Sequence, residues 1–186
     1  MKIEFLEHIL TQDSPSKLIK ENEEEILKMI PQLNLCKDFE QNNIWHIYNV
    51  YDHILCVVDN VQNDINIRLA ALFHDIGKPF VYHEDEEGIG HFYGHWEKSK
   101  EIFETFSIKY KIDEKQYKLI SNLILYHDIN VDKLDNEKLN QMINKLGKDG
   151  IIMLFDLKKS DLLAQNPKFH YLLDSYEHQK QKILKK

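Results

Sequence analysis

The feature that most constrains the fold is an apolar run that leads directly into a histidine and an aspartate. Leu69–Phe73 is followed at once by His74 and Asp75, and then by Gly77 and Lys78. Five consecutive apolar residues in a helical setting predict a helix that is buried on all sides. A charged side chain in a protein interior is costly unless it is paired or bound to a metal. The segment therefore predicts an interior polar site among packed helices.

Helical spacing of apolar residues continues along most of the chain, and glycine and proline are scarce, with six and four residues. This pattern predicts an almost all-α protein. Gly77 is the expected C-cap of the helix that precedes it, and Gly147 is expected to end another helix. Residues 80–83 and 89–92 are expected to pair as a short β-hairpin beside the site, where it would act as a lid. The expected helices are at about 16–30, 44–60, 65–76, 94–106, 113–126, 136–146 and 149–164, with a polar helix after Pro167.

Length and composition limit the class of protein. The 186 residues predict a single domain, 1–186, and the net charge of −7 argues against a general nucleic-acid-binding surface. Arg68 is the only arginine, so bidentate recognition of phosphate by a guanidinium is available at one place only. Cys36 and Cys56 are too few for a disulfide framework, and the N-terminus lacks a signal-peptide core, which predicts a cytoplasmic protein. No apolar run is long enough to span a membrane, so no membrane partner is expected.

Imidazole and carboxylate side chains on several expected helices are candidate metal ligands, as in metal sites inside helical bundles. His74 and Asp75 cannot lie on one helix face, but they reach two neighbouring metals if the helix end opens out and Asp75 bridges them. Such a site would activate water and hold a phosphate, and Lys78 would neutralise a phosphate oxygen. The six candidates are His53, His74, Asp75, His95, His127 and Asp161.

Taken singly, most of these residues also have a structural interpretation. His53 would be a core histidine, and His127 would terminate a helix near its last carbonyl groups. His95 would be a surface residue in a first helical turn, and Asp161 would pair with Lys158. The metal-site prediction therefore depends on the whole set. Spacing selects none of the other histidines of this region, His46, His83 and His91.

In this order and setting, the residues resemble the HD superfamily of metal-dependent phosphohydrolases. Longer stretches are similar to the HD domain attached to bacterial CCA-adding tRNA nucleotidyltransferases, and the resemblance covers roughly residues 30–170. It implies an HD-type helical bundle with this core and a flanking helix at each end. The stretches that carry it are Val50–His53, Arg68–Pro79, Gly90–His95 and Lys159–Pro167.

The resemblance also implies roles for the candidate residues. His53, His74, Asp75 and Asp161 would be the core ligands, and binuclear members add two histidines, for which His95 and His127 are suitably placed. Asp75 would bridge the ions, and Lys78 would assist the phosphate. The implied cofactor is one or two divalent metal ions, which the sequence does not distinguish among manganese, iron, cobalt, nickel, magnesium and zinc.

The implied activity is metal-dependent hydrolysis, by a phosphodiesterase or phosphatase, of a nucleotide, a 2',3'-cyclic phosphate or a small phosphoester. The chain lacks the Gly-Ser pair with paired aspartates of a nucleotidyltransferase domain, and it lacks a basic tRNA-binding tail. We therefore expect a freestanding HD domain without nucleotide addition. One alternative is a non-catalytic nucleotide- or partner-binding module with a structural metal. The other is a di-iron HD-fold oxygenase, against which Lys78 weighs because an ammonium suits phosphate.

Overall fold

Helices are the main element of the computed structural model, which describes residues 2–185 and confirms the all-α class. Within this range no helix is long and apolar enough to cross a membrane. Short 3-10 helices occur at Val131–Lys133 and Pro167–Leu172. The other elements are α1 (Ile3–Leu10), α2 (Pro15–Glu21), α3 (Glu23–Met29), α4 (Leu33–Cys36), α5 (Val50–Asn60), α6 (Ile65–Phe73), α7 (Lys78–Val81), β1 (His83–Glu84), β2 (Gly90–His91), α8 (His95–Tyr110), α9 (Glu114–Tyr126), α10 (Asn136–Leu163) and α11 (Leu173–Leu184).

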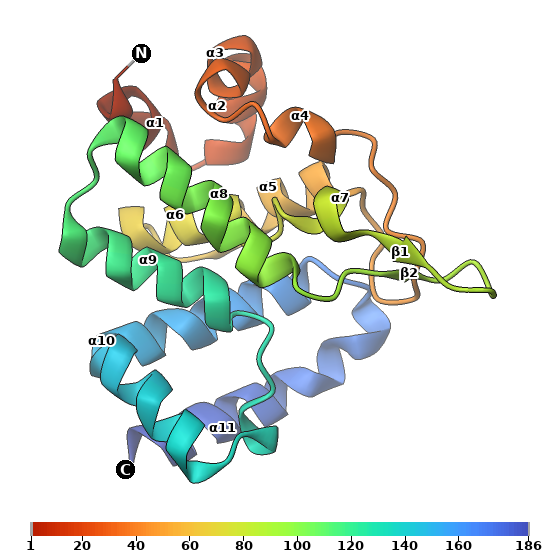
Figure 1. Ribbon diagram of the computed structural model, residues 1–186, viewed down its shortest axis with the longest axis vertical. Coiled ribbons are helices and arrows are strands. Elements are labelled where there is room, and N and C mark those ends of the chain that lie inside the picture. Colours follow the sequence, from red (N-terminus) through yellow and green to blue (C-terminus); the bar gives the residue numbers. More distant parts are fainter. Residues whose placement is uncertain (1, 186) are drawn as a thin grey trace.

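The helix α6 lies inside the bundle, where it packs against α5, α8, α9 and α10 (Figure 1). Asp64 caps its N-terminus by accepting hydrogen bonds from the backbone N–H groups of Asn66 and Ile67, at 2.8 and 3.4 Å. Every residue of Ile67–Phe73 is buried, as the apolar run predicts. Full burial of one large aliphatic or aromatic side chain stabilises a fold by about 1.5–3 kcal/mol. The helix therefore carries the chain at His74 into a well-packed interior.

Arg68, the only arginine, holds α1 and the turn after it against α6. Its guanidinium is buried and donates hydrogen bonds to the backbone oxygens of Leu10 and Gln12, the second at 2.7 Å. The acceptors of these hydrogen bonds are backbone carbonyl groups and not the oxygens of a phosphate. Arg68 is therefore a structural residue.

Gly77 is not the left-handed C-cap that the sequence predicts. The helix α6 ends at Phe73, and Gly77 has an ordinary right-handed conformation with φ of −78°. The position requires glycine because of packing: a Cβ there would lie 2.5 Å from the carbonyl oxygen of His95 and 2.7 Å from the backbone nitrogen of Ser99. The turn that follows α6 is therefore pressed directly against the first turns of α8.

Replacement of Gly77 by alanine is expected to lower the free energy of unfolding by about 3 kcal/mol, because the added methyl group meets backbone atoms that cannot rotate away. For a chain of this length that corresponds to a fall in melting temperature of about 6–12 °C. Thermal unfolding followed by circular dichroism measures the change. A variant that melts with the wild-type protein would show that α8 moves aside at little cost.

Several helix boundaries differ from those predicted. The helix expected at 44–60 begins at Val50, because Asn49 caps α5 by accepting a hydrogen bond from the backbone N–H of Asp52 at 2.8 Å. Residues 44–49 form a loop instead. The helix expected at 16–30 is divided at Asn22 into α2 and α3. The expected break at Gly147 is confirmed, since its φ of 63° kinks α10. Neither α1 nor α4 was predicted.

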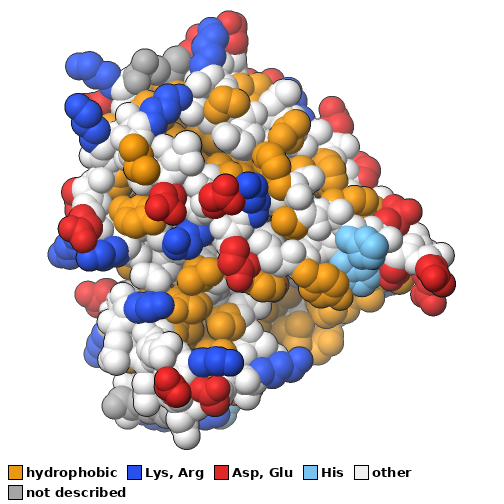
Figure 2. Space-filling model, viewed as in Figure 1, with side chains coloured by type: hydrophobic (Ala, Val, Ile, Leu, Met, Phe, Trp, Pro, Cys, Tyr) orange, Lys and Arg blue, Asp and Glu red, His pale blue; other side chains and the backbone are white. Residues whose placement is uncertain are grey.

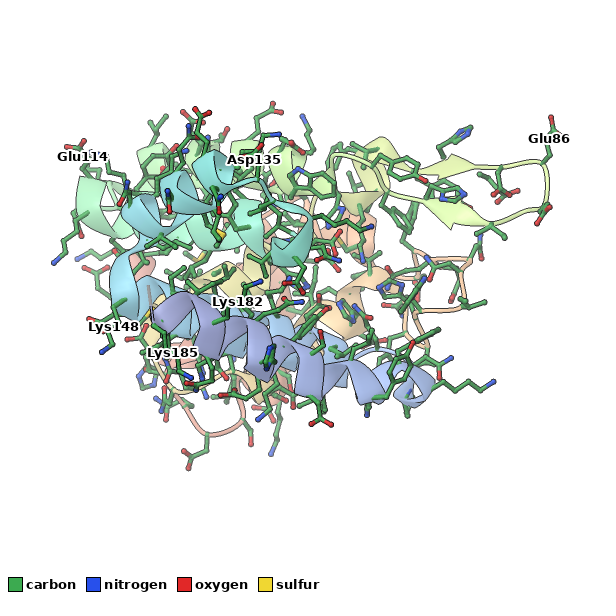
Figure 3. All side chains as sticks on the ribbon, turned by 90° about the horizontal axis from the view of Figure 1, so that it is seen from below. Glu86, Glu114, Asp135, Lys148, Lys182 and Lys185 are labelled. Carbon is green, nitrogen blue, oxygen red and sulfur yellow. The ribbon has the colours of Figure 1, made fainter. Side chains whose placement is uncertain are left out.

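The predicted hairpin is present but shorter. His83 pairs with His91 in an antiparallel register, and α7 replaces the start of the first strand because Pro79 favours a helical turn. The hairpin projects from the bundle, with Glu86 at its far end and Glu114 and Lys148 near the opposite end of the molecule (Figure 3). Figure 2 shows acidic side chains gathered at the projecting end. The hairpin thus carries a local excess of negative charge.

Candidate metal centre

All six predicted ligands converge on one point inside the bundle. Each is at most 9% exposed, although the six come from elements that are far apart in the sequence. His53 lies in α5 and Asp161 in α10, whereas His74 and Asp75 lie in the turn after α6. The other two lie at helix ends: His95 is the first residue of α8, and His127 follows the last residue of α9.

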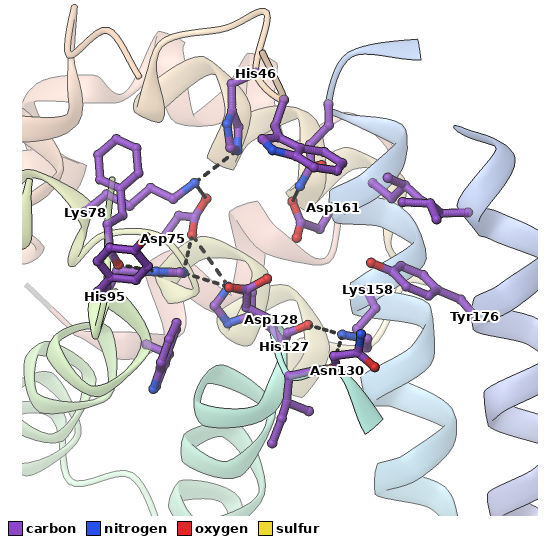
Figure 4. A pocket seen from close by; sticks show the side chains of 18 of the residues that line it. His46, Asp75, Lys78, His95, His127, Asp128, Asn130, Lys158, Asp161 and Tyr176 are labelled. Atoms are coloured by element: carbon purple, nitrogen blue, oxygen red, sulfur yellow. Dashed lines mark hydrogen bonds and ion pairs between the residues drawn. The ribbon is translucent and has the colours of Figure 1, made fainter. Parts of the chain in front are cut away.

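Asp75 lies at the centre of the group (Figure 4). Its Oδ2 atom lies 3.2 Å from Nε2 of His53 and 3.3 Å from Nε2 of His74. Its Oδ1 atom lies 3.2 Å from Nε2 of His95 and 3.6 Å from Nε2 of His127. Each oxygen of the carboxylate therefore faces a different pair of imidazoles.

Asp161 adds a second carboxylate on the Oδ2 side of Asp75. Its Oδ1 atom lies 3.0 Å from Nε2 of His53, so its partner is this histidine and not Lys158 as in the structural alternative. One ring nitrogen each of His53 and His74 and a carboxylate oxygen of Asp161 lie within 4.8 Å of one another. This spacing would let the three residues ligate a single ion.

Three of the histidines are oriented in the same way. Nδ1 of His74, His95 and His127 bonds the carbonyl oxygen three positions earlier in the chain, at 2.7, 2.9 and 2.7 Å. A carbonyl group only accepts hydrogen bonds, so each Nδ1 carries the proton. In the neutral ring the Nε2 atom is then a lone-pair donor, which is the arrangement of metal-ligating histidines.

These lone pairs are directed at one another and at Asp75. The Nε2 atoms of His95 and His127 are 3.2 Å apart, and those of His53 and His74 are 3.4 Å apart. Within residues 2–185 the ion pair with Lys78 is made by Oδ2 of Asp75, whereas Oδ1 faces only the Nε2 atoms of His95 and His127. Buried acceptors that face one another in this way repel unless a cation lies among them. The residues present therefore fit a bound divalent metal.

The carboxyl groups are ionised despite their burial. Burial opposes ionisation of Asp75, but the neighbouring imidazole of His74 and the ammonium of Lys78 hold the pKa of this carboxyl well below its usual range. Burial likewise opposes ionisation of Asp161, but its hydrogen bond with His53 keeps its pKa low. Burial alone would lower the pKa of His53, whereas the hydrogen bonds with Asp161 and Asp75 raise it to about 9. Both carboxylates are thus negatively charged at neutral pH, as ligands must be.

Residues that the sequence analysis did not single out as ligands, Gln41 and His46, surround the ammonium of Lys78. The ammonium of Lys78 donates hydrogen bonds to Oε1 of Gln41 at 2.8 Å and to Nε2 of His46 at 3.2 Å. It also forms an ion pair with Oδ2 of Asp75 at 2.6 Å. Nδ1 of His46 donates to Oδ1 of Asn43 at 2.8 Å. Burial, followed by the charge of Lys78, lowers the pKa of His46 to about 2, so the ring is neutral.

On its other side the group opens into a cavity of about 440 Å³, the size of a small organic ligand. The hairpin and the segment after it form one wall, so the hairpin lies beside the site as predicted, and α11 forms another. The action of the hairpin as a lid stays a prediction. Lys158 also lines the cavity; it donates hydrogen bonds to the carbonyl oxygens of His127 and Ile129, and burial lowers its pKa to about 8. The aromatic lining residues are Trp45, Phe92, Tyr93, Trp96 and Tyr176.

Two comparisons with known proteins bear on the family of this chain. A family model described as HD domain matches residues 44–158, which include five of the six converging residues. The chain is 29% identical over 115 residues to the CC-adding tRNA nucleotidyltransferase of Thermus thermophilus. That match covers 59% of this chain and 26% of the Thermus protein, so the likeness concerns about a quarter of the relative.

Proposed function

The chain belongs to the HD domain family, a superfamily of metal-dependent hydrolases, and we propose from this premise that it is a phosphohydrolase. The proposed activity is that of a phosphodiesterase or phosphatase. The proposed substrate class is a nucleotide, a 2',3'-cyclic phosphate or a small phosphoester. The proposed ligands are the six residues that converge, His53, His74, Asp75, His95, His127 and Asp161.

The observation that carries this proposal is that the two carboxylate oxygens of Asp75 face two different pairs of imidazoles. Its Oδ2 atom faces His53 and His74 at 3.2 and 3.3 Å. Its Oδ1 atom faces His95 and His127 at 3.2 and 3.6 Å. Two ligand groups that share one carboxylate support two divalent ions, drawn from manganese, iron, cobalt, nickel, magnesium or zinc.

Divalent ions held there would supply a Lewis acid for the phosphate and a water molecule of lowered pKa. Asp75 would hold the two ligand groups together and supply negative charge at their centre. Lys78 would keep Asp75 ionised and oriented, through the ion pair at 2.6 Å, and its positive charge would offset part of the charge of a phosphate. His46 and Gln41 would fix the position of the Lys78 ammonium.

The cavity supports a substrate with a flat organic group. Trp45 and Tyr93 are 41% and 74% exposed, and both line the cavity. Aromatic faces of this kind stack on nucleobases with little preference for sequence. A nucleotide with its phosphate at the ligand group and its base among these rings is consistent with a cavity of about 440 Å³.

Metal analysis of the purified protein tests the two-ion form of the proposal. We expect about two equivalents of metal in the wild-type protein and about one in His127→Ala, because this change removes one ligand from the Oδ1 side only. Plasma mass spectrometry gives the metal content, and hydrolysis of bis(p-nitrophenyl) phosphate and p-nitrophenyl phosphate gives the activity. His83→Ala, an exposed histidine of the hairpin, is the matched control.

The other outcomes distinguish the alternatives. One equivalent that is insensitive to His127→Ala would indicate a single ion held by His53, His74, Asp75 and Asp161. Iron with oxygen consumption, and no hydrolysis, would indicate an oxygenase. No metal after reloading with manganese, and no turnover of either phosphoester, would contradict the hydrolase and favour a binding module.

A further inference from the structure

A direct hydrogen bond to a phosphate in this cavity requires a donor with a free N–H group. The basic residues of the chain differ in how many of their N–H groups have no acceptor. Arg68 donates from Nη1 to the backbone oxygens of Leu10 and Gln12, and it does not line the cavity. Lys78 has three N–H groups and three protein acceptors, Gln41, His46 and Asp75. Lys78 is therefore saturated, and its positive charge is already matched by a carboxylate.

Lys158 is in the opposite situation. It is only 4% exposed, and its ammonium donates to the carbonyl oxygens of His127 at 2.7 Å and of Ile129 at 2.9 Å. Among the residues that the structure describes it has no ion pair, and the ring of Tyr176 at 5.0 Å is the aromatic face nearest to it. Two of its three N–H groups are thus in use. The nearby carboxylates Asp128 and Asp161 favour its charge but form no ion pair with it, so the third N–H group has no acceptor among the described residues.

A buried N–H group without an acceptor is costly, so an anion that accepts from the third N–H group of Lys158 would be stabilised there. Lys158 lines the cavity that also contains Asp75, His95 and His127. It precedes Asp161 by three residues in α10, and residues three apart lie on one helix face. Figure 4 shows its ammonium between His127 and Tyr176, on the cavity side of the ligand group.

We propose that Lys158, and not Lys78, makes the direct contact with a phosphate oxygen of the substrate. This inference rests on the proposed function, because it assumes that a phosphate binds beside the ligand group. Lys158 then has two tasks: two N–H groups hold the end of α9, and the third meets the anion. Lys78 acts on the same phosphate only through Asp75 and through its charge.

Binding of inorganic phosphate to the manganese-loaded protein tests the inference without a known substrate. Isothermal titration calorimetry first measures manganese and then phosphate, for the wild-type protein and for Lys158→Gln, Lys158→Arg and Lys159→Gln. Glutamine keeps two N–H groups for the carbonyl oxygens but loses the charge, whereas arginine keeps both. Lys159 is the matched control because it is the exposed neighbour on the same helix.

We expect Lys158→Gln to bind phosphate at least tenfold more weakly while its manganese stoichiometry stays that of the wild-type protein. Lys158→Arg is expected to bind phosphate within about threefold of wild type, and Lys159→Gln to be unchanged. Equal phosphate affinity in Lys158→Gln would overturn the inference. Loss of manganese in Lys158→Gln would also overturn it, because Lys158 would then only hold His127. Absence of manganese from every protein, the wild type included, would contradict the proposed function itself.

Discussion

Asp75→Asn is expected to remove the bound metal and to lower phosphoester hydrolysis by at least about a thousandfold, which corresponds to about 4 kcal/mol in the barrier. Asp75 is the residue that both imidazole pairs share, so this change acts on every ligand group at once. The amide nitrogen of asparagine cannot ligate a cation, and the substitution removes the negative charge of the carboxylate. Plasma mass spectrometry and hydrolysis of bis(p-nitrophenyl) phosphate measure the two effects.

The same change is expected to leave the ammonium of Lys78 buried without its counter-ion. Removal of one member of a buried ion pair costs about 3–5 kcal/mol, so the apoprotein of the variant should melt below the wild-type apoprotein. Asp174→Asn makes the same chemical change on an exposed face of α11 and is the control. An Asp75→Asn protein that keeps both its metal and its turnover would refute the assignment of this residue.

Removal of metal from the wild-type protein is expected to lower its melting temperature by about 5–15 °C. A ligand that binds only the folded state at 100 to 1,000 times its Kd stabilises that state by about 2.7–4.1 kcal/mol. For a chain of this size each kcal/mol shifts the melting temperature by about 2–4 °C. The physical reason is local: without a cation, the lone pairs of His95 and His127 face each other at 3.2 Å.

Differential scanning calorimetry with and without a chelator measures this shift. Asp75→Asn is the internal control, since a protein without a site should melt at the same temperature in both solutions. The shift should shrink as the pH falls from 7 to 5, because the imidazoles must be deprotonated to bind metal. If the wild-type protein melts at the same temperature with and without the chelator, this result would contradict a metal bound among the six proposed ligands.

Most helices were predictable because their signals are local. The apolar run before His74 predicted a buried helix, and Asp113 predicted the start of α9, where it accepts hydrogen bonds from Lys115 and Gln116 at 3.0 and 3.1 Å. The start of α5 was predicted six residues too early, because Ile47 continues the apolar spacing but is 53% exposed in a loop. Periodicity alone does not distinguish an exposed apolar residue from a buried one.

The candidate ligands were identifiable as a set, through the His74–Asp75 pair and the resemblance that it carries. His46 and Gln41 were not, because their role depends on Lys78, which is more than 30 positions away in the chain. The loop that contains His46 is held by Asn166, whose backbone N–H donates to the carbonyl oxygen of Trp45 at 2.7 Å. The nearest sequence signal was the tryptophan beside His46, which no periodic pattern explains.

Lys158 shows the same limit. In the sequence it is one of two adjacent lysines, and only the fold separates the buried Lys158 from the exposed Lys159. Hydrogen-bond partners such as the carbonyl oxygen of His127 lie 31 positions away. Sequence spacing therefore does not reveal which N–H groups of Lys158 have no acceptor.

By itself the sequence determined that this chain is helical and where most of its helices lie, since these signals come from neighbours within a few helical turns. Through the His74–Asp75 pair and the family resemblance it also indicated which residues could hold a metal. Only the tertiary structure decided that Asp75 stands between two pairs of imidazoles, that Lys78 is saturated, and that Lys158 is not. Those facts depend on contacts between elements that are far apart in the chain, because tertiary packing determines which N–H groups have a protein acceptor and which do not.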